Sequence, residues 1–171
     1  QKNLFATRDV WTSIRDEKTA GIIRRDDAHG VWEVAVPMGV VAAVIPVTNP
    51  TSTALFKILI ALKGRNAIVL SPHPRALRCI RASAEVMEKA ATAAGAPAGL
   101  IQCLGQPTLA ATEALMRHPD TAVILATGGE GLVKAAYSSG KPAYGVGPGN
   151  VPVWVDRSAD LALAAKCLVS S

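Results

Sequence analysis

Residues 39–63 read GVVAAVIPVTNPTSTALFKILIALK, and this stretch decides the fold. The run 39–45 is apolar and rich in β-branched residues, a pattern typical of a strand that is buried on both faces. A loop with two prolines ends the run, and 51–63 then reads as a helix, with Asn49 or Thr51 available as its cap. A buried strand that passes through a short loop into a helix predicts one unit of a parallel α/β sheet.

The same alternation of strand and helix continues through the rest of the chain. The predicted strands are 66–70, 100–104, 121–126 and 151–155, the predicted helices are 75–94, 107–117, 130–139 and 158–170, and 22–25 with 31–36 predict a hairpin. We therefore expect an α/β, Rossmann-like fold, with a mostly parallel sheet and helices on both faces. No linker or repeat divides the sequence, so residues 1–171 are expected to be one domain or most of one.

The composition indicates a globular protein. Half of the 171 residues are hydrophobic and 18% are charged, which excludes disorder. The net charge is +5, but the cations are scattered and only 4% of residues are aromatic, so we expect no nucleic-acid partner. The apolar run 40–47 is far shorter than the roughly 20 residues of a membrane span. Because 1–17 is polar and lacks the apolar segment of a secretory signal, we expect a cytoplasmic protein with no membrane partner.

The three cysteines, Cys79, Cys103 and Cys167, indicate a reducing compartment. They form neither a close pair of metal-ligand spacing nor an even disulfide set, so we expect no metal site. None has a neighbouring histidine, and small buried cysteines are common in protein cores.

Five loops are expected at the carboxyl ends of the strands, where α/β sheets bind ligands. They are 46–51, 71–75, 105–108, 126–131 and 144–152. The run Thr127-Gly128-Gly129 opens a helix, where free N–H groups attract phosphate and glycines allow close approach. It is not the Gly-x-Gly-x-x-Gly fingerprint, and a glycine-rich turn without a ligand explains the pattern equally well.

Several long motifs, in the same order, resemble those of the CoA-acylating aldehyde dehydrogenases. They are Pro37-Met38-Gly39-Val40, the run from Pro46 to Lys57, Leu62-Lys63-Gly64-Arg65-Asn66-Ala67-Ile68, Ser71-Pro72-His73-Pro74-Arg75-Ala76, Thr127-Gly128-Gly129, the run from Ala135 to Pro142, and Gly145-Val146-Gly147-Pro148-Gly149-Asn150. The resemblance extends from Asp16 nearly to the end of the chain. It is strongest to the aldehyde dehydrogenase half of bifunctional aldehyde/alcohol dehydrogenases and to acylating sulfoacetaldehyde dehydrogenase.

This resemblance implies a reaction in three parts. A cysteine thiolate attacks a short-chain aldehyde, hydride passes to NAD or NADP, and CoA as co-substrate takes the acyl group. The family's nucleophile motif is absent, so we expect the chain to be the NAD(P)-binding part, with the catalytic cysteine outside it. We also expect the full-length protein to be a homo-oligomer.

The resemblance also assigns site residues. Asn49 is the catalytic candidate, as a hydrogen-bond donor to the substrate oxyanion. In hydrolytic relatives the corresponding asparagine lies one position earlier, at Thr48 here. The residues expected at the cofactor are Pro46, Val47, Thr48, Asn49, Ser71, His73, Gly105, Thr127, Gly128, Gly129 and Gly147.

Two departures from the hydrolytic relatives favour CoA as the acyl acceptor. Ser71-Pro72-His73 replaces a Lys-Pro pair that holds the adenosine ribose, which relaxes the choice between NAD and NADP and leaves room for CoA. No Asp or Glu occurs in 137–155, where the hydrolytic enzymes carry a glutamate as general base. Without that base, water is poorly activated, whereas a thiol needs less help.

One alternative function stays open. The chain could be a non-catalytic nucleotide- or CoA-binding module, which the missing nucleophile and the lack of an oligomerisation hairpin would favour.

Overall fold

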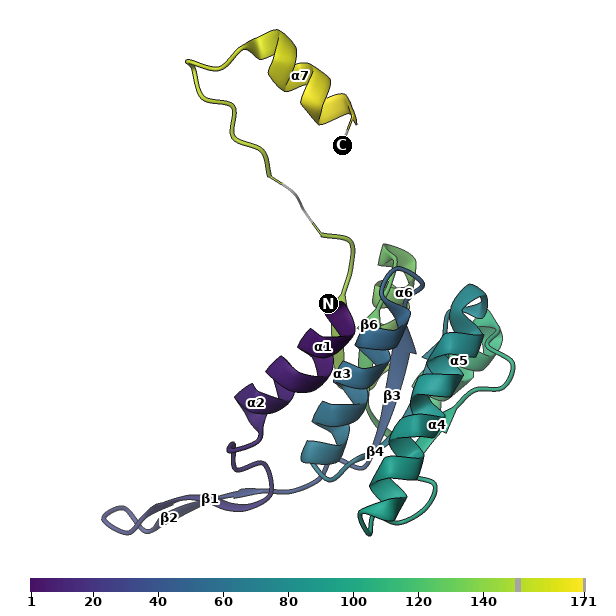
Figure 1. Ribbon diagram of the computed structural model, residues 1–171. Coiled ribbons are helices and arrows are strands. Elements are labelled where there is room, and N and C mark those ends of the chain that lie inside the picture. Colours follow the sequence, from purple (N-terminus) through teal and green to yellow (C-terminus); the bar gives the residue numbers. More distant parts are fainter. Residues whose placement is uncertain (150–151, 171) are drawn as a thin grey trace.

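The centre of the molecule is a five-stranded parallel sheet, seen in a computed structural model that describes residues 1–149 and 152–170 (Figure 1). Its strands lie in the order β5-β4-β3-β6-β7. Their bounds are β3 Val40–Ile45, β4 Ala67–Pro72, β5 Ile101–Cys103, β6 Thr121–Thr127 and β7 Ala143–Val146. The predicted α/β fold is confirmed, and the quoted stretch forms the central strand together with the helix that follows it.

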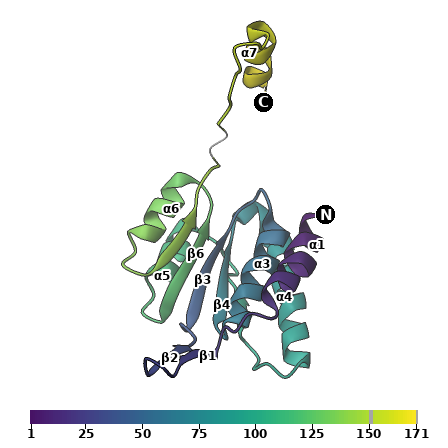
Figure 2. The same ribbon diagram turned by 90° about the vertical axis from the view of Figure 1, so that its left-hand side faces the viewer.

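Helices cover both faces of the sheet (Figure 2). On one face lie α3 (Pro50–Lys63) and α4 (Leu77–Ala93). A short 3₁₀ turn, η2 (Pro74–Ala76), leads into α4. On the other face lie α5 (Leu109–Arg117) and α6 (Glu130–Tyr137). Alternate residues of β3 pack into two hydrophobic cores, one on each face of the sheet. Val41, Ala43 and Ile45 pack toward α3 and α4, whereas Ala42 and Val44 pack toward α5 and α6. A strand buried on both faces needs apolar residues at every position, and this requirement explains the uninterrupted run 39–45.

An N-terminal helix packs along α3 and was not predicted. It consists of α1 (Lys2–Leu4), a π-helical segment η1 (Phe5–Asp9) and α2 (Val10–Ile14). Ala6 is the residue that this helix buries, so its sequence carries little of the apolar periodicity that reveals a helix. The hydroxyl of Thr19, which donates to the carbonyl of Lys63 at 2.6 Å, fastens the following segment to the end of α3.

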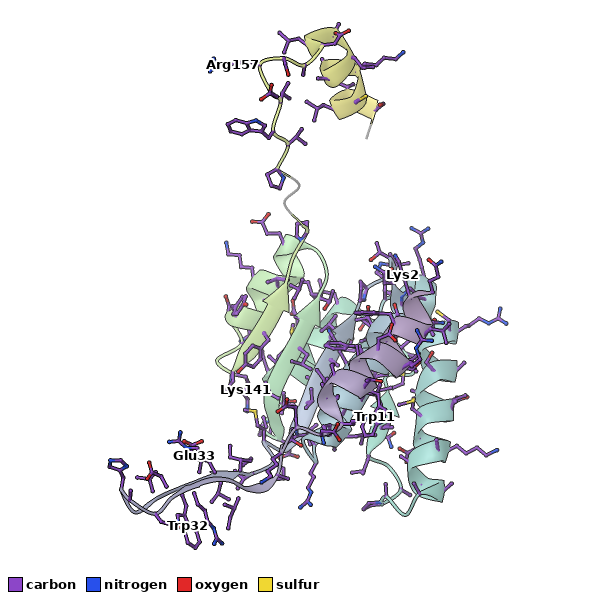
Figure 3. The ribbon with its side chains drawn as sticks, turned by 60° about the vertical axis from the view of Figure 1, so that its left-hand side comes forward. Lys2, Trp11, Trp32, Glu33, Lys141 and Arg157 are labelled. Atoms are coloured by element: carbon purple, nitrogen blue, oxygen red, sulfur yellow. The ribbon has the colours of Figure 1, made fainter. Side chains whose placement is uncertain are left out.

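The predicted hairpin is confirmed as β1 (Gly21–Asp26) and β2 (Val31–Ala35), which project from the body as an arm (Figure 3). Its two faces differ in chemistry. Trp32 lies on one face, with the guanidinium of Arg25 4.2 Å from the centre of its ring. On the other face Glu33 pairs with Arg24 at 3.0 Å.

The last predicted strand, 151–155, is wrong for the residues that the structure describes there. Residues 152–155 form no strand, and Val151 lies outside the described residues. The fifth strand of the sheet is instead β7, of which residues 144–146 belong to the loop 144–152 expected from the sequence. The predicted final helix is confirmed as α7 (Leu161–Ser170), which buries none of its residues and lies apart from the sheet (Figure 1).

Each free edge of the sheet is capped by a side chain from a neighbouring helix. At β5, the carboxylate of Glu88 accepts hydrogen bonds from the N–H groups of Gly99 and Ile101. At β7, the hydroxyl of Tyr137 accepts from the N–H of Gly145 at 3.0 Å. Gly145 must be glycine, because a Cβ there would lie 2.5 Å from Cγ1 of Val133. These caps occupy outward backbone groups that would otherwise pair with another strand.

Candidate functional site

The strand order creates a switch point between β3 and β6. From β3 the chain steps outward through β4 to β5, and it then returns to pair β6 with the other side of β3. The loops after β3 and β6 therefore leave the sheet in opposite directions and open a crevice at its carboxyl edge. Ligands of open α/β sheets bind at this point, so it is the first place to look for a site.

Lys57 lies beneath this crevice and joins the two strands. Its side chain is 4% exposed. Its Nζ donates to the carbonyl of Val44 in β3 at 2.8 Å and to the carbonyl of Leu125 in β6 at 2.7 Å. Burial disfavours the ammonium form and lowers the pKa of Lys57 to about 7. An uncharged amine has two N–H groups, which is enough to serve both carbonyls.

A cleft of about 700 Å³ opens above Lys57, between the N-terminal helix and the start of α3. Its wall is mostly apolar, with Leu4, Phe5 and Phe56 among the lining side chains. Of the residues predicted from the sequence, Asn49 and Thr127 line it. Its volume lies within the range of small-molecule sites, which are largely apolar with a few polar groups.

The side chain of Asn49 is directed to the cleft instead of capping α3. Asn49 is the N-cap residue, but its side chain makes no capping hydrogen bond, and Pro50 follows it at the first helical position. Its Oδ1 accepts a hydrogen bond of 2.6 Å from Nζ of Lys2. The expected cap is thus not formed, whereas the neighbouring Thr48, the alternative oxyanion donor, is exposed and lies outside the cleft wall.

The turn after β6 leads into the start of α6. The N–H of Gly128 is used within the fold, donating to the carbonyl of Val146 at 3.1 Å. Within the described residues, no protein group accepts from the N–H groups of Gly129, Glu130 or Gly131. A Cβ on Gly129 would meet nothing within 4 Å. This helix start therefore has the open space and the free donors that an anionic group requires.

Ser71 and His73, predicted at the cofactor, both take part in bonds of the fold itself. Ser71 is 1% exposed, and its hydroxyl lies 2.7 Å from that of Thr112 in α5. This hydroxyl ties β4 to α5 and presents no group to a ligand. Half-buried His73 caps the turn η2, its Nδ1 accepting from the N–H of Arg75 at 3.2 Å.

The other predicted residues lie around the same edge of the sheet. Pro46 and Val47 are on the loop beside the cleft, and Gly105 follows β5, where its carbonyl accepts from Nη2 of Arg81 at 3.1 Å. Gly147 follows β7, and a Cβ there would meet nothing within 4 Å.

The cysteines lie away from the cleft. None of Cys79, Cys103 and Cys167 lines it, and all three are free thiols. Burial raises the pKa of the Cys103 thiol, which disfavours the reactive thiolate. Across 1–149 and 152–170 no group of three His, Cys, Asp or Glu side chains could hold a metal ion, and no helix is long and apolar enough to cross a membrane.

The sequence analysis missed Lys57, at the base of the cleft, and the side of the cleft that the N-terminal helix forms. Lys57 occupies a helix position where a lysine is unremarkable, and the quoted motif contained it without revealing its burial. Phe5 and Lys2 belong to the unpredicted N-terminal helix. An apolar helix face with a lysine in its middle is the one signal that was available for Lys57, since such a lysine must find partners or lose its charge.

The match to a family model decides the relationship. The model of the aldehyde dehydrogenase family matches residues 6–171. The chain belongs to the aldehyde dehydrogenase family. Every part of the site described above falls within the match except Lys2 and the start of the N-terminal helix.

Proteins similar to this chain include acetylating and bifunctional aldehyde dehydrogenases. The bifunctional aldehyde-alcohol dehydrogenase of Escherichia coli is 51% identical over 170 residues, 99% of this chain and 19% of the relative. The crystal structure of an acetylating aldehyde dehydrogenase from Geobacillus thermoglucosidasius has 64% identity and a TM-score of 0.88, covering 99% of this chain and 38% of that one. A propionaldehyde dehydrogenase from Rhodopseudomonas palustris, solved with bound propionyl-CoA, has 40% identity and a TM-score of 0.68 over 76% of this chain and 29% of its own. The chain thus spans less than two fifths of each.

Lys57 should make the stability of the chain depend on pH in the alkaline range. Between pH 7 and 10.5 an unfolded chain holds a proton on this amine that the folded chain has released. Unfolding then takes up a proton, so the free energy of unfolding rises with pH, by at most about 1.4 kcal/mol per unit. Urea unfolding at pH 7.5 and 9.5 should show a rise about 2 kcal/mol larger in wild type than in Lys57→Met. Equal rises in the two proteins would show that Lys57 keeps its proton when buried.

Proposed function

We propose that this chain is the nicotinamide-cofactor-binding part of an enzyme that oxidises a short-chain aldehyde to acyl-CoA. The observation that carries the proposal is the cleft at the β3–β6 switch point, which Asn49 and Thr127 both line. Named relatives support it, since they include acetylating and propionaldehyde dehydrogenases, one of them with bound propionyl-CoA. The nucleophilic cysteine would lie outside this chain.

The start of α6 suits the pyrophosphate of NAD or NADP. The free N–H groups of Gly129, Glu130 and Gly131 provide donors, and the helix dipole favours negative charge at this end. The bare Cα of Gly129 lets the ligand approach the backbone. The cofactor, when bound, would accept hydride from the substrate carbon. Because Ser71 at the end of β4 is neutral and buried, neither NAD nor NADP is selected there.

Asn49 would stabilise the substrate oxyanion. Its Nδ2 has no acceptor among the described protein groups, whereas its Oδ1 is occupied by Lys2. A carboxamide N–H held in this way, beside a largely apolar wall, can donate to an oxygen that gains negative charge in the transition state. The apolar lining from Leu4, Phe5 and Phe56 suits a short alkyl aldehyde.

The scarcity of carboxylates in the described cleft wall supports CoA as the acyl acceptor. The cleft wall contains one carboxylate, that of Asp9, and Nε of Arg8 pairs with it at 2.8 Å. The β7 strand and its loop carry no acidic side chain. The described part of this chain would thus offer a thioester no unpaired carboxylate to activate water, which favours a thiol as the nucleophile.

Replacing Gly129 tests the cofactor site. Gly129 has φ −67 and ψ 162, which any residue adopts, and the space around its Cα is open, so Gly129→Val should fold normally. If the pyrophosphate lies on this backbone, the Kd for NADH or NADPH should rise at least about tenfold, as expected when close approach is lost. Fluorescence titration measures it, with exposed Ala90→Val in α4 as control. Gly128→Val is less informative, because a Cβ at Gly128 would already lie 2.7 Å from Cδ2 of Leu132.

The acyl acceptor is tested in the full-length enzyme. Without CoA, aldehyde and NAD or NADP should give about one equivalent of reduced cofactor per active site, since a positioned base that would assist hydrolysis by about 10²- to 10⁴-fold is missing. Sustained turnover, with acyl-CoA as product, should begin when CoA is added, and the isolated 171-residue chain should show none. Steady formation of free acid without CoA would identify water as the acceptor.

The hairpin arm supports a homo-oligomer. Ile22, Trp32 and Val34 lie on one face of β1 and β2 and are each at least 40% exposed, an unusual amount of apolar surface on a projecting arm. The sequence analysis expected no oligomerisation hairpin; we propose instead that a second copy covers this face of the arm. Light scattering of full-length Trp32→Asp should show smaller assemblies than the wild type; an unchanged mass would contradict the proposal.

A cytoplasmic location is part of the same proposal. Three free thiols and a reaction that consumes the thiol of CoA both suit a reducing compartment. Cell fractionation would test it, and recovery outside the cytoplasm would overturn it.

A further inference from the structure

We propose that Lys2 is a positioning residue that fixes the direction of the Asn49 carboxamide and strengthens it as a donor. The proposal rests on the oxyanion role proposed above for Asn49. Lys2 comes from the first turn of the N-terminal helix, near the carboxyl edge of the sheet (Figure 3), and reaches across the cleft to a residue 47 positions away in the chain.

The chemistry of the two groups permits one arrangement of the amide. An ammonium group has three donors and no acceptor, so Lys2 can bind Oδ1 of Asn49 but not its Nδ2. The observed distance of 2.6 Å from Nζ to Oδ1 is that of a short, charge-assisted hydrogen bond. With Oδ1 occupied, Nδ2 is the end of the carboxamide that stays available for a ligand.

Nothing else in the described structure sets this orientation. The Asn49 side chain makes no capping bond to α3, and no described group accepts from Nδ2. Without Lys2 the amide could rotate by half a turn and direct Oδ1 to the substrate oxygen, where it would repel the developing charge. The cation also polarises the carbonyl, which makes the N–H groups on the same amide stronger donors.

The other charged side chains described at the cleft are bound to other partners, so they do not compete with Lys2 for Asn49. The carboxylate of Asp9, which lines the same cleft, pairs with Nε of Arg8 at 2.8 Å. The amine of Lys57 is bound to the carbonyls of Val44 and Leu125. Of the described cations that line the cleft, Lys2 is thus the one that contacts a group proposed to act on the substrate.

A general attraction for anionic NAD or CoA is the competing explanation for a cation here. That attraction would lower KM for the cofactors and would persist when Asn49 is removed. If Lys2 instead positions Asn49, losing Lys2 should lower kcat, because the oxyanion forms in the transition state. The same loss should have no effect on kcat when Asn49 is absent.

The experiment is a double-mutant cycle in the full-length enzyme with saturating NAD or NADP and CoA. Lys2→Met should lower kcat about tenfold at unchanged KM for aldehyde, less than the about 10²–10³ lost when an oxyanion donor is removed, as in Asn49→Ala. Lys2→Arg, which keeps the charge and the donors, should recover most of the activity. In the Asn49→Ala background Lys2→Met should change nothing further. Arg15→Met, at the C-cap of the same helix and outside the cleft wall, is the control for charge.

Two outcomes separate this inference from the proposed function. If Asn49→Ala leaves kcat unchanged, the oxyanion role of Asn49 is wrong. If Asn49→Ala lowers kcat but Lys2→Met does not, or lowers it equally in both backgrounds, only the role of Lys2 is wrong.

A second measurement needs no activity. In the NMR spectrum of the 171-residue chain, the side-chain NH₂ resonances of Asn49, assigned by their loss in Asn49→Ala, should shift in Lys2→Met and stay in place in Arg15→Met. Unchanged resonances in Lys2→Met would overturn the contact itself.

Discussion

The amine of Lys57, bound to one carbonyl of β3 and one of β6, is the interaction on which the site depends. These two strands are neighbours in the sheet but are far apart in the chain, and the loops that follow them form opposite sides of the crevice. A buried amine that serves both strands fixes the separation of the loops from below. Hydrophobic packing, which has no direction, could not specify that separation as closely.

The rest of the fold holds the strands around Lys57 in place. Two apolar cores hold β3 from both sides, and Glu88 and Tyr137 cap the outer strands. The hydroxyls of Ser71 and Thr112 tie the end of β4 to α5. The loops at the carboxyl edge can therefore hold irregular, polar conformations, because the strands beneath them are fixed.

Ser71 shows how the residue type decides whether a side chain faces a ligand or bonds within the protein. A lysine at the end of this strand would extend toward a ligand, whereas the short serine hydroxyl finds its partner inside the protein, on Thr112. With serine at this position, the end of β4 carries no cation there. This missing cation is the physical reason for the proposal that neither NAD nor NADP is selected here.

Local pattern determined the alternation of elements in this protein. The strands β3, β4 and β6 are apolar at nearly every position, and the helices between them have clear ends, so the parallel sheet and the set of loops at its carboxyl edge followed from the sequence. The sequence could not reveal β7, a short strand with a glycine, because its pairing with β6 and its packing under Tyr137 are what make it a strand. Nor could it reveal that Lys57 is buried, that Asn49 leaves its helix cap, or that Lys2 meets Asn49. Each of these depends on a partner far away in the chain, and only the tertiary structure decides which distant groups come together.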